Sequence, residues 1–341
     1  MLQLFTDTRS NTDISASSNV FVLVNGGTGG AIWMFLAVFF GFYAAVISMA
    51  EMASMAPTTG GQYHWVSEFA PKSAQRILSY YVGWLCVLGW QMGNAAIAYL
   101  AGTIIQGIVT LNNPSYKPHP YESLLMIWAV LTFSILFNTF LASKLPLVEG
   151  VILCLHIAGF FAILIPLWVL GDKGNASDVF FTFSDGGGWG NTGLSCLVGM
   201  LTTMFSLLGP DSATHMSEEL RDASLTLPRA MVWTMAANGA MGFLMIVTFC
   251  MVAGNVTELL SSPTGYTFIQ LFYNVTGSHA GASVMSALIV VILIFGCVTN
   301  FATSSRQMWA FARDKGLPFS GFLSAVGLKP HTLIKPCGTS D

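Results

Sequence analysis

Hydrophobic and polar positions alternate along this chain on the scale of whole helices. Uncharged, mostly apolar stretches have their cores at roughly 29–50, 79–109, 123–142, 150–170, 193–210, 231–254 and 282–305. A helix that crosses a bilayer needs about 20 mostly apolar residues, so these stretches predict seven membrane-spanning helices. The apolar segment 19–24 is too short to span and predicts a helical stub.

The composition agrees with this pattern. Of 341 residues, 54% are hydrophobic and 9% are charged, whereas a soluble domain carries about 25% charged residues. The chain is therefore expected to be an all-α polytopic membrane protein whose surroundings are a lipid bilayer. Its net charge is −3 and it has no run of Lys or Arg, so a nucleic acid partner is not expected.

Cysteine usage and motif content argue against several chemistries. Neither a disulfide framework nor a zinc site is expected, because the sequence has no C-x-x-C spacing and five of its six cysteines lie in apolar runs. No nucleophile–base pair or phosphate-binding loop stands out, so we expect neither an enzyme nor a cofactor. The first 18 residues lack the basic and apolar regions of a cleaved signal peptide.

The loops between the predicted helices differ in charge, which predicts the orientation. One set of loops is expected in the cytoplasm because it carries most of the basic residues, namely Lys72, Arg76, Lys144, Arg221, Arg229, Arg306, Arg313 and Lys315. The alternate set carries only Lys117 and Lys173. The alternate, external loops also hold three N-x-[ST] sequons, so Asn175, Asn255 and Asn274 are candidates for glycosylation.

The fifth apolar stretch ends in an unusual way, in the segment SLLGPDSATHMSEEL at 206–220. Pro210 cannot donate a helical hydrogen bond, so Gly209-Pro210 predicts an interruption of the helix. An ionisable Asp211 near bilayer depth is a candidate site residue. The alternatives are a simple proline kink, and an Asp211 that caps a restarted helix at the cytoplasmic interface, where Ser212, Thr214 and His215 offer further capping groups.

Other polar residues lie close to or within the apolar stretches. His215 and Glu218 have a spacing that suits metal ligands, but a solvated helix end with Glu218 or Glu219 near Arg221 is the favoured interpretation. The sole imidazole well inside a span is His156, which is a candidate proton relay or a packing residue. The remaining deep polar residues either join helices or line a site, namely Gln91, Asn94, Asn300, Thr303 and Ser304.

Three longer motifs carry a resemblance to a known family. They are EMASMAPTTGGQYHWVSEFAP at 51–71, GPDSATHMSEELRDASLTLPRAM at 209–231 and SSRQMWAFARDKGLPFS at 304–320. Together they resemble the fungal amino acid, GABA and choline permeases of the amino acid–polyamine–organocation (APC) superfamily. The resemblance runs from about residue 19 to residue 320.

The resemblance implies the five-plus-five inverted-repeat transporter fold, in which broken helices 1 and 6 hold the substrate. The stub would be the end of helix 1, and the seven full spans would be helices 2 to 8. The substrate site would then be lined by Phe205, Ser206, Leu208, Gly209, Pro210 and Asp211, by Gln91 and Asn94, by Asn300, and by Ser17 and Ser18. Protons are the coupling ion that the family implies, with His156 and Asp211 as the residues that would carry them. Candidate ion pairs of an inner gate are Glu51, Glu218, Glu219, Arg221 and Arg306.

The sequence divides into a segment 1–18 outside the resemblance, a partial transporter domain at 19–320 and an irregular tail at 321–341. Half of helix 1 and helices 9 to 12 have no counterpart, so we expect a relative that is truncated at both ends. The predicted function is proton-coupled uptake of an amino acid or a related amine such as GABA or choline, at the plasma membrane or an organelle membrane. The alternative is a seven-span receptor or a regulatory fragment without transport activity.

Overall fold

A computed structural model describes residues 18–325, with side chains described from residue 21 to residue 325. In this part of the chain every regular element is helical. Seven helical segments are long and apolar enough to cross a membrane, which confirms the predicted spans. They are Gly27–Met55, Gln75–Asn112, Pro120–Phe140, Ala142–Leu170, Thr192–Glu219, Ala223–Val252 and His279–Arg313.

Most of these spans are single α-helices. The long helices are α2 (Gly27–Met55), α4 (Gln75–Asn112), α5 (Pro120–Phe140), α6 (Leu145–Leu170, after the 3₁₀ turn η2 at Ala142–Lys144), α9 (Ala223–Val252) and α12 (His279–Arg313). The fifth span is divided into α8 (Thr192–Ser206) and the 3₁₀-helix η3 (Pro210–Glu219). The predicted stub forms the short helix α1 (Ser18–Val24).

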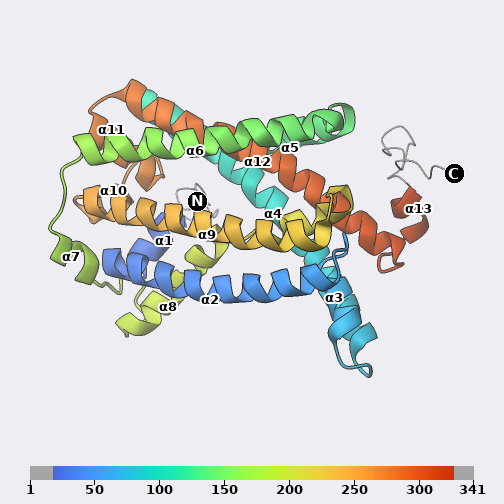
Figure 1. Ribbon diagram of the computed structural model, residues 1–341. Coiled ribbons are helices and arrows are strands. Elements are labelled where there is room, and N and C mark those ends of the chain that lie inside the picture. The colour runs from blue at the N-terminus through green and yellow to red at the C-terminus, as the bar shows by residue number, and fades with distance from the viewer. Residues whose placement is uncertain (1–17, 326–341) are drawn as a thin grey trace.

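The remaining short helices lie at the two ends of the bundle. Helices α3 (Gln62–Phe69) and α13 (Ser320–Ala325) lie at one end, and α7 (Ala176–Phe181), α10 (Val256–Leu260) and α11 (Thr267–Thr276) lie at the other (Figure 1). The three sequon asparagines belong to this second end and are exposed. Asn175 and Asn255 precede α7 and α10, where their side chains accept backbone N–H groups, and Asn274 lies within α11.

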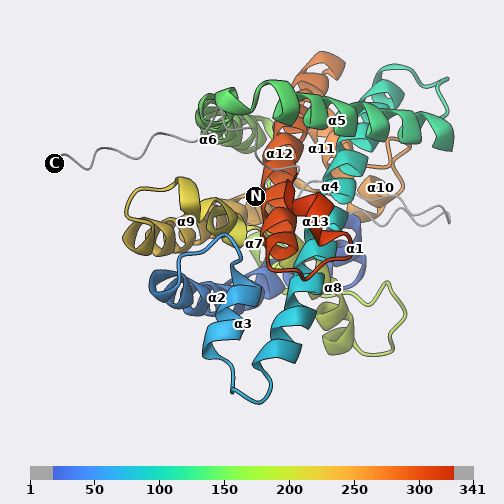
Figure 2. The same ribbon diagram turned by 90° about the vertical axis from the view of Figure 1, so that its right-hand side faces the viewer.

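The long helices form two groups that matter for the site. Helix α2 packs along α9 and also contacts α8 and η3, whereas α4 packs along α12 and α5. Figure 2 shows α12 in the middle of the bundle, with α4, α5 and α6 around it. Glycines allow close approach within each group, because a Cβ at Gly239 would lie 1.9 Å from the Phe39 ring, and one at Gly83 would lie 2.3 Å from the Phe311 ring.

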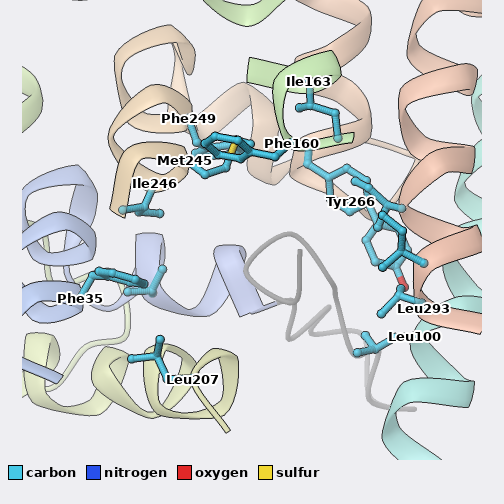
Figure 3. Close-up of a cluster of buried hydrophobic side chains, with 14 of the residues drawn as sticks. Phe35, Leu100, Phe160, Ile163, Leu207, Met245, Ile246, Phe249, Tyr266 and Leu293 are labelled. Carbon is cyan, nitrogen blue, oxygen red and sulfur yellow. The ribbon is translucent and has the colours of Figure 1, made fainter. Parts of the chain in front are cut away.

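A continuous apolar core joins the two groups. Phe249 and Met245 of α9 lie next to Phe160 of α6, and Tyr266 and Leu293 lie further along the same core (Figure 3). Phe35 of α2 and Leu207, just after α8, contribute from the other side (Figure 3). By contrast, α5 and α6 leave large apolar side chains exposed, as expected for helix faces that contact lipid.

A strap formed by residues 182–189 covers the junction between α1 and α2. The backbone N–H of Gly29 donates to Thr182 O, that of Ser184 donates to Gly26 O, and that of Gly186 donates to Val24 O. The indole N–H of Trp189 adds a hydrogen bond of 2.7 Å to Asn25 Oδ1. These contacts satisfy backbone groups that the interruption between α1 and α2 would otherwise leave unpaired.

Candidate functional site

The interruption predicted at Gly209-Pro210 is present. Helix α8 ends at Ser206, and Gly209 has φ 110°, a conformation that glycine adopts without steric cost. From Pro210 the chain continues as a 3₁₀-helix of ten residues, where the sequence predicted a restarted helix. Because 3₁₀ runs of more than three or four residues are uncommon, contacts with other segments must hold this one.

Asp211 supplies the first of these contacts. Its Oδ2 accepts a hydrogen bond of 2.6 Å from Nε2 of Gln62, at the start of α3. The side chain is half-buried. The alternative in which Asp211 caps a restarted helix is wrong, because the capping position is Gly209 and no side chain caps η3.

His215 supplies the second contact and is fully buried, with a relative exposure of 0%. Its Nδ1 lies 2.9 Å from Thr59 O, and its Nε2 accepts a hydrogen bond of 3.2 Å from the indole N–H of Trp90 in α4. The expectation of a solvated helix end is therefore wrong at His215. Thr214, also expected to cap, is buried and donates its hydroxyl to Met231 Sδ at 3.8 Å.

The loop between α2 and α3 is shaped to lie against His215. Gly61 has φ 58°, and a Cβ there would lie 3.1 Å from His215 Cε1. The indole N–H of Trp65 anchors the start of the loop through a hydrogen bond of 2.9 Å to Ala56 O. Gly61 therefore meets a steric need beside the imidazole, whereas a Cβ at Gly60 would meet the Tyr63 ring at 2.9 Å.

A polar cluster joins α4 to α12 at a deeper level. Asn94 is 4% exposed; its Nδ2 donates to Ser304 Oγ and its Oδ1 accepts from Asn300 Nδ2, both at 2.7 Å. Each polar group of this cluster thus has a partner on the neighbouring helix. Gln91 was expected beside Asn94, but it lies on the exposed face of α4 with Leu88 and Met92.

The rest of the predicted site residues on α8 and η3 lie around the break. Phe205, Gly209 and Pro210 are half-buried, and Leu208 is exposed. Ser206 is buried and donates its hydroxyl to Thr203 O at 2.7 Å. Ser17 lies outside the described residues, as does the side chain of Ser18.

The charges at the end of η3 form ion pairs with α12, and Arg313, which was not among the five candidate gate residues, takes part in one of them. Arg306 Nη2 lies 2.7 Å from Glu219 Oε1, and Arg313 Nη2 lies 3.5 Å from Glu218 Oε1. Glu51 and Arg221 are exposed and take part in no ion pair within the described part of the chain. The expected pairing of Glu218 or Glu219 with Arg221 is wrong because both arginines on α12 face η3.

Tyr63 adds a third link at this end of the bundle, between α3 and the end of α12. Its hydroxyl donates to Asp314 Oδ2 at 2.9 Å, and its ring lies 5.1 Å from that of Phe311. Burial raises the pKa of Tyr63 well above its usual value, and the Asp314 carboxylate raises this pKa further.

His156 lies on α6, away from the break, and is half-buried. Its Nε2 is buried and has no hydrogen-bond partner among the described residues. A buried imidazole nitrogen without a partner lowers the stability of the fold. Either a bound group satisfies this nitrogen, or the loss of stability is retained because the residue has a function.

Sequence reasoning did not assign the contacts that four residues make at the site, namely Thr59, Gln62, Trp90 and Arg313. Each lies far along the chain from its partner, so periodicity gave no signal for it. The usable signal was the adjacent pair Gly60-Gly61, which marks a close approach of backbone to another group.

The profile of the amino acid permease family matches residues 9–336. A Macrophomina phaseolina protein named as an amino acid/polyamine transporter is 35% identical over 318 residues, which cover 92% of this chain and 70% of that protein. The choline transporter of Saccharomyces cerevisiae is 29% identical over 288 residues, covering 84% of this chain and 50% of the transporter.

The GABA-specific permease of Saccharomyces cerevisiae is 29% identical over 327 residues, which cover 90% of this chain and 56% of the permease. This chain thus spans between 50% and 70% of the length of these three relatives. The matches confirm the resemblance to the APC superfamily, and the family is one of permeases rather than enzymes. With seven membrane-spanning helices and a match over most of its length, the chain is an integral membrane protein that belongs to the amino acid permease family.

Proposed function

We propose that this chain is a secondary transporter of small amines or amino acids, coupled to protons and located in the plasma membrane. The observation that carries the proposal is the divided fifth span, with Asp211 at the start of η3. Irregular backbone at membrane depth is tolerated only where protein buries it or where it lines a wet cavity. A transport pathway is a natural place for such a segment.

The residues around the break suit a substrate that carries a nitrogen cation. The Asp211 carboxylate attracts an ammonium group, and the half-buried Phe205 ring offers a π face to it. The proposed site consists of Phe205, Ser206, Leu208, Gly209, Pro210 and Asp211, with Asn94 and Asn300 on the facing helices. The relatives are named for polyamine, choline and GABA transport, and all three substrate classes carry a nitrogen cation.

Proton coupling has two candidate residues in this proposal. Asp211 is a carboxylate at the break, and His156 holds a buried Nε2 that is unpartnered among the described residues. An imidazole is the side chain whose ordinary titration range overlaps physiological pH. His156 is therefore the first position at which to look for loss of coupling.

Uptake into proteoliposomes with an imposed pH gradient tests the proposal. Radiolabelled choline, GABA, spermidine and a neutral amino acid would be compared with empty liposomes. We expect gradient-driven accumulation of at least one of them, and we expect His156→Ala to weaken the dependence on the gradient. Folded protein that accumulates none of the four would contradict the proposed function, and unchanged coupling in His156→Ala would remove that residue.

A further inference from the structure

The hydrogen bonds of His215 determine which of its nitrogens carries the proton. An indole N–H can only donate, so Nε2 of His215 must be the acceptor in its 3.2 Å contact with Trp90. A backbone carbonyl can only accept, so Nδ1 must donate to Thr59 O at 2.9 Å. The buried imidazole is therefore neutral, with its hydrogen on Nδ1.

A second proton would act on the two contacts in opposite ways. The bond from Nδ1–H to Thr59 O would persist, because a charged donor strengthens it. At Nε2, however, a new N–H would face the N–H of Trp90, so two donors would meet and the hydrogen bond would be lost. A proton on His215 would thus keep the loop at Thr59 attached to η3 and release Trp90.

These two contacts belong to different parts of the molecule. The loop at Thr59 joins α2, which packs with α9, to α3, which packs along α4. His215 is on η3, which contacts α2 and α9 of one helix group and α12 of the other, so its bond to Trp90 of α4 lies at the seam where the two groups meet. The ion pairs of Glu219 with Arg306 and of Glu218 with Arg313 cross the same seam at the surface.

Burial disfavours a charge on the His215 imidazole, so uptake of the proton and opening of the seam are expected to occur together. The Asp211 carboxylate, four residues earlier on η3, acts against this cost of burial. Glu218 and Glu219 of η3 are exposed and paired with arginines. Other charged or titratable residues on the elements around η3 include Glu51 of α2, His64 of α3, Cys86 of α4, Arg229 of α9, and Arg306 and Arg313 of α12.

We propose that His215 is a proton-operated link at this seam, closed when the imidazole is neutral and opened when Nε2 takes up a proton. The role of this link rests on the proposed function, because in proton-coupled transport the bound proton must change which helices are held together. It concerns a residue that the substrate site does not use. Its state can be measured without any substrate.

Cys86 is a native reporter of this seam. It lies four residues before Trp90 on α4, so it is on the same helix face, and it is half-buried. A polar, membrane-impermeant thiol reagent would be applied to permeabilised membranes that contain the full chain. Modification would be quantified by mass spectrometry of the peptide that holds Cys86, so the other cysteines can stay.

Three proteins would be compared at about pH 5.5 and about pH 7.5, on either side of the ordinary histidine range. His215→Gln keeps one donor for Thr59 O and one acceptor for Trp90 but cannot take up the proton. Trp90→Phe keeps the ring and removes the N–H, so the seam lacks its link at both pH values. Rates are compared between variants at the same pH, which cancels the pH dependence of the thiol itself.

At about pH 7.5 the wild type and His215→Gln should label slowly, and Trp90→Phe about tenfold faster, as expected for loss of one hydrogen bond. At about pH 5.5 the wild type should approach the rate of Trp90→Phe, whereas His215→Gln should stay slow. If the wild type and His215→Gln label equally at the lower pH, the proposal is overturned. A Trp90→Phe rate equal to that of the wild type at the higher pH also overturns it.

If His215→Gln does not fold, the ratio of the wild-type labelling rate to the Trp90→Phe labelling rate still tests the proposal. This ratio should rise from about one tenth to about one on acidification, and a constant ratio contradicts the proposal. Failure of the uptake experiment would refute the proposed function and leave this result unaffected. Failure of the labelling experiment would remove the His215 link and leave transport open.

Discussion

Asn94 is the residue that satisfies two polar side chains of α12 at once. Its replacement by Ala would leave the Asn300 amide without its acceptor and would remove a donor from Ser304. We expect Asn94→Ala to lower the free energy of unfolding by about 1–3 kcal/mol, the usual cost of unsatisfied buried polar groups. Denaturant unfolding in mixed micelles measures this.

Gln91→Ala is the matched control for that change. It alters the same helix three residues earlier, on the exposed face, and should shift stability by less than about 0.5 kcal/mol. Equal effects of the two changes would mean that the Asn94 cluster does not hold α4 to α12.

Gly61 allows the loop to lie against His215 because it has no side chain. We expect Gly61→Ala to lower the melting temperature and to expose the loop to proteases. The added Cβ would meet His215 Cε1 at 3.1 Å, and the φ of 58° disfavours any side chain. Gly89→Ala is the control, because a Cβ there meets nothing within 4 Å and Ala favours the helix. A Gly61→Ala protein as stable as the control would show that the close approach is not required.

At the scale of single residues, the sequence singled out Asp211 and His215 but did not indicate which residues they contact. Asp211 and His215 were singled out because charge and imidazole are rare at this position. Their partners Gln62 and Trp90 lie 149 and 125 residues away in sequence, so no local pattern could have indicated them. The pair Gly60-Gly61 was the one visible trace of that contact.

Among the elements, α3 is joined to the end of α12 by the hydrogen bond of Tyr63 to Asp314, and this contact has a pH dependence. Burial raises the pKa of Tyr63 above that of the same group in the unfolded chain. The stability is therefore intact below the unfolded value of about 10 and falls as the pH rises above it.

Between about pH 9.5 and about pH 11, we expect the melting temperature of the wild type to fall more steeply than that of Tyr63→Phe, because the variant has no phenol at this position to titrate. Melting curves across this range measure the difference. Tyr81→Phe, which changes an exposed tyrosine of α4, should follow the wild type. A wild-type curve parallel to that of Tyr63→Phe would contradict the prediction.

At the scale of elements, the sequence predicted the spans well and the broken one only in part. Length and lack of charge suffice to indicate a membrane helix, because the bilayer sets both. The break at Gly209 followed from Pro210 and the glycine. That η3 is a 3₁₀-helix follows from contacts of Asp211, Thr214 and His215 with other segments, which local propensity does not encode.

At the scale of the whole molecule, the helices form two groups joined by a core, with one interrupted span between them. The seam at η3 is crossed by the His215–Trp90 bond and by two ion pairs on half-buried or exposed side chains. Exposed ion pairs contribute little to stability, so they are easily broken. Such a seam suits a molecule in which two rigid parts must separate and close again.

The central claim is that Asp211 at the break takes part in substrate uptake. The most direct test compares uptake by wild type, Asp211→Asn and Asp222→Asn in proteoliposomes, using a substrate identified in the panel above. Asp222 is an exposed carboxylate just before α9. Its φ is 49°, a conformation that Asn also adopts, so Asp222→Asn is a matched control. We expect a loss of uptake of about tenfold or more in Asp211→Asn alone, with membrane insertion unchanged. Equal uptake by all three proteins would contradict it.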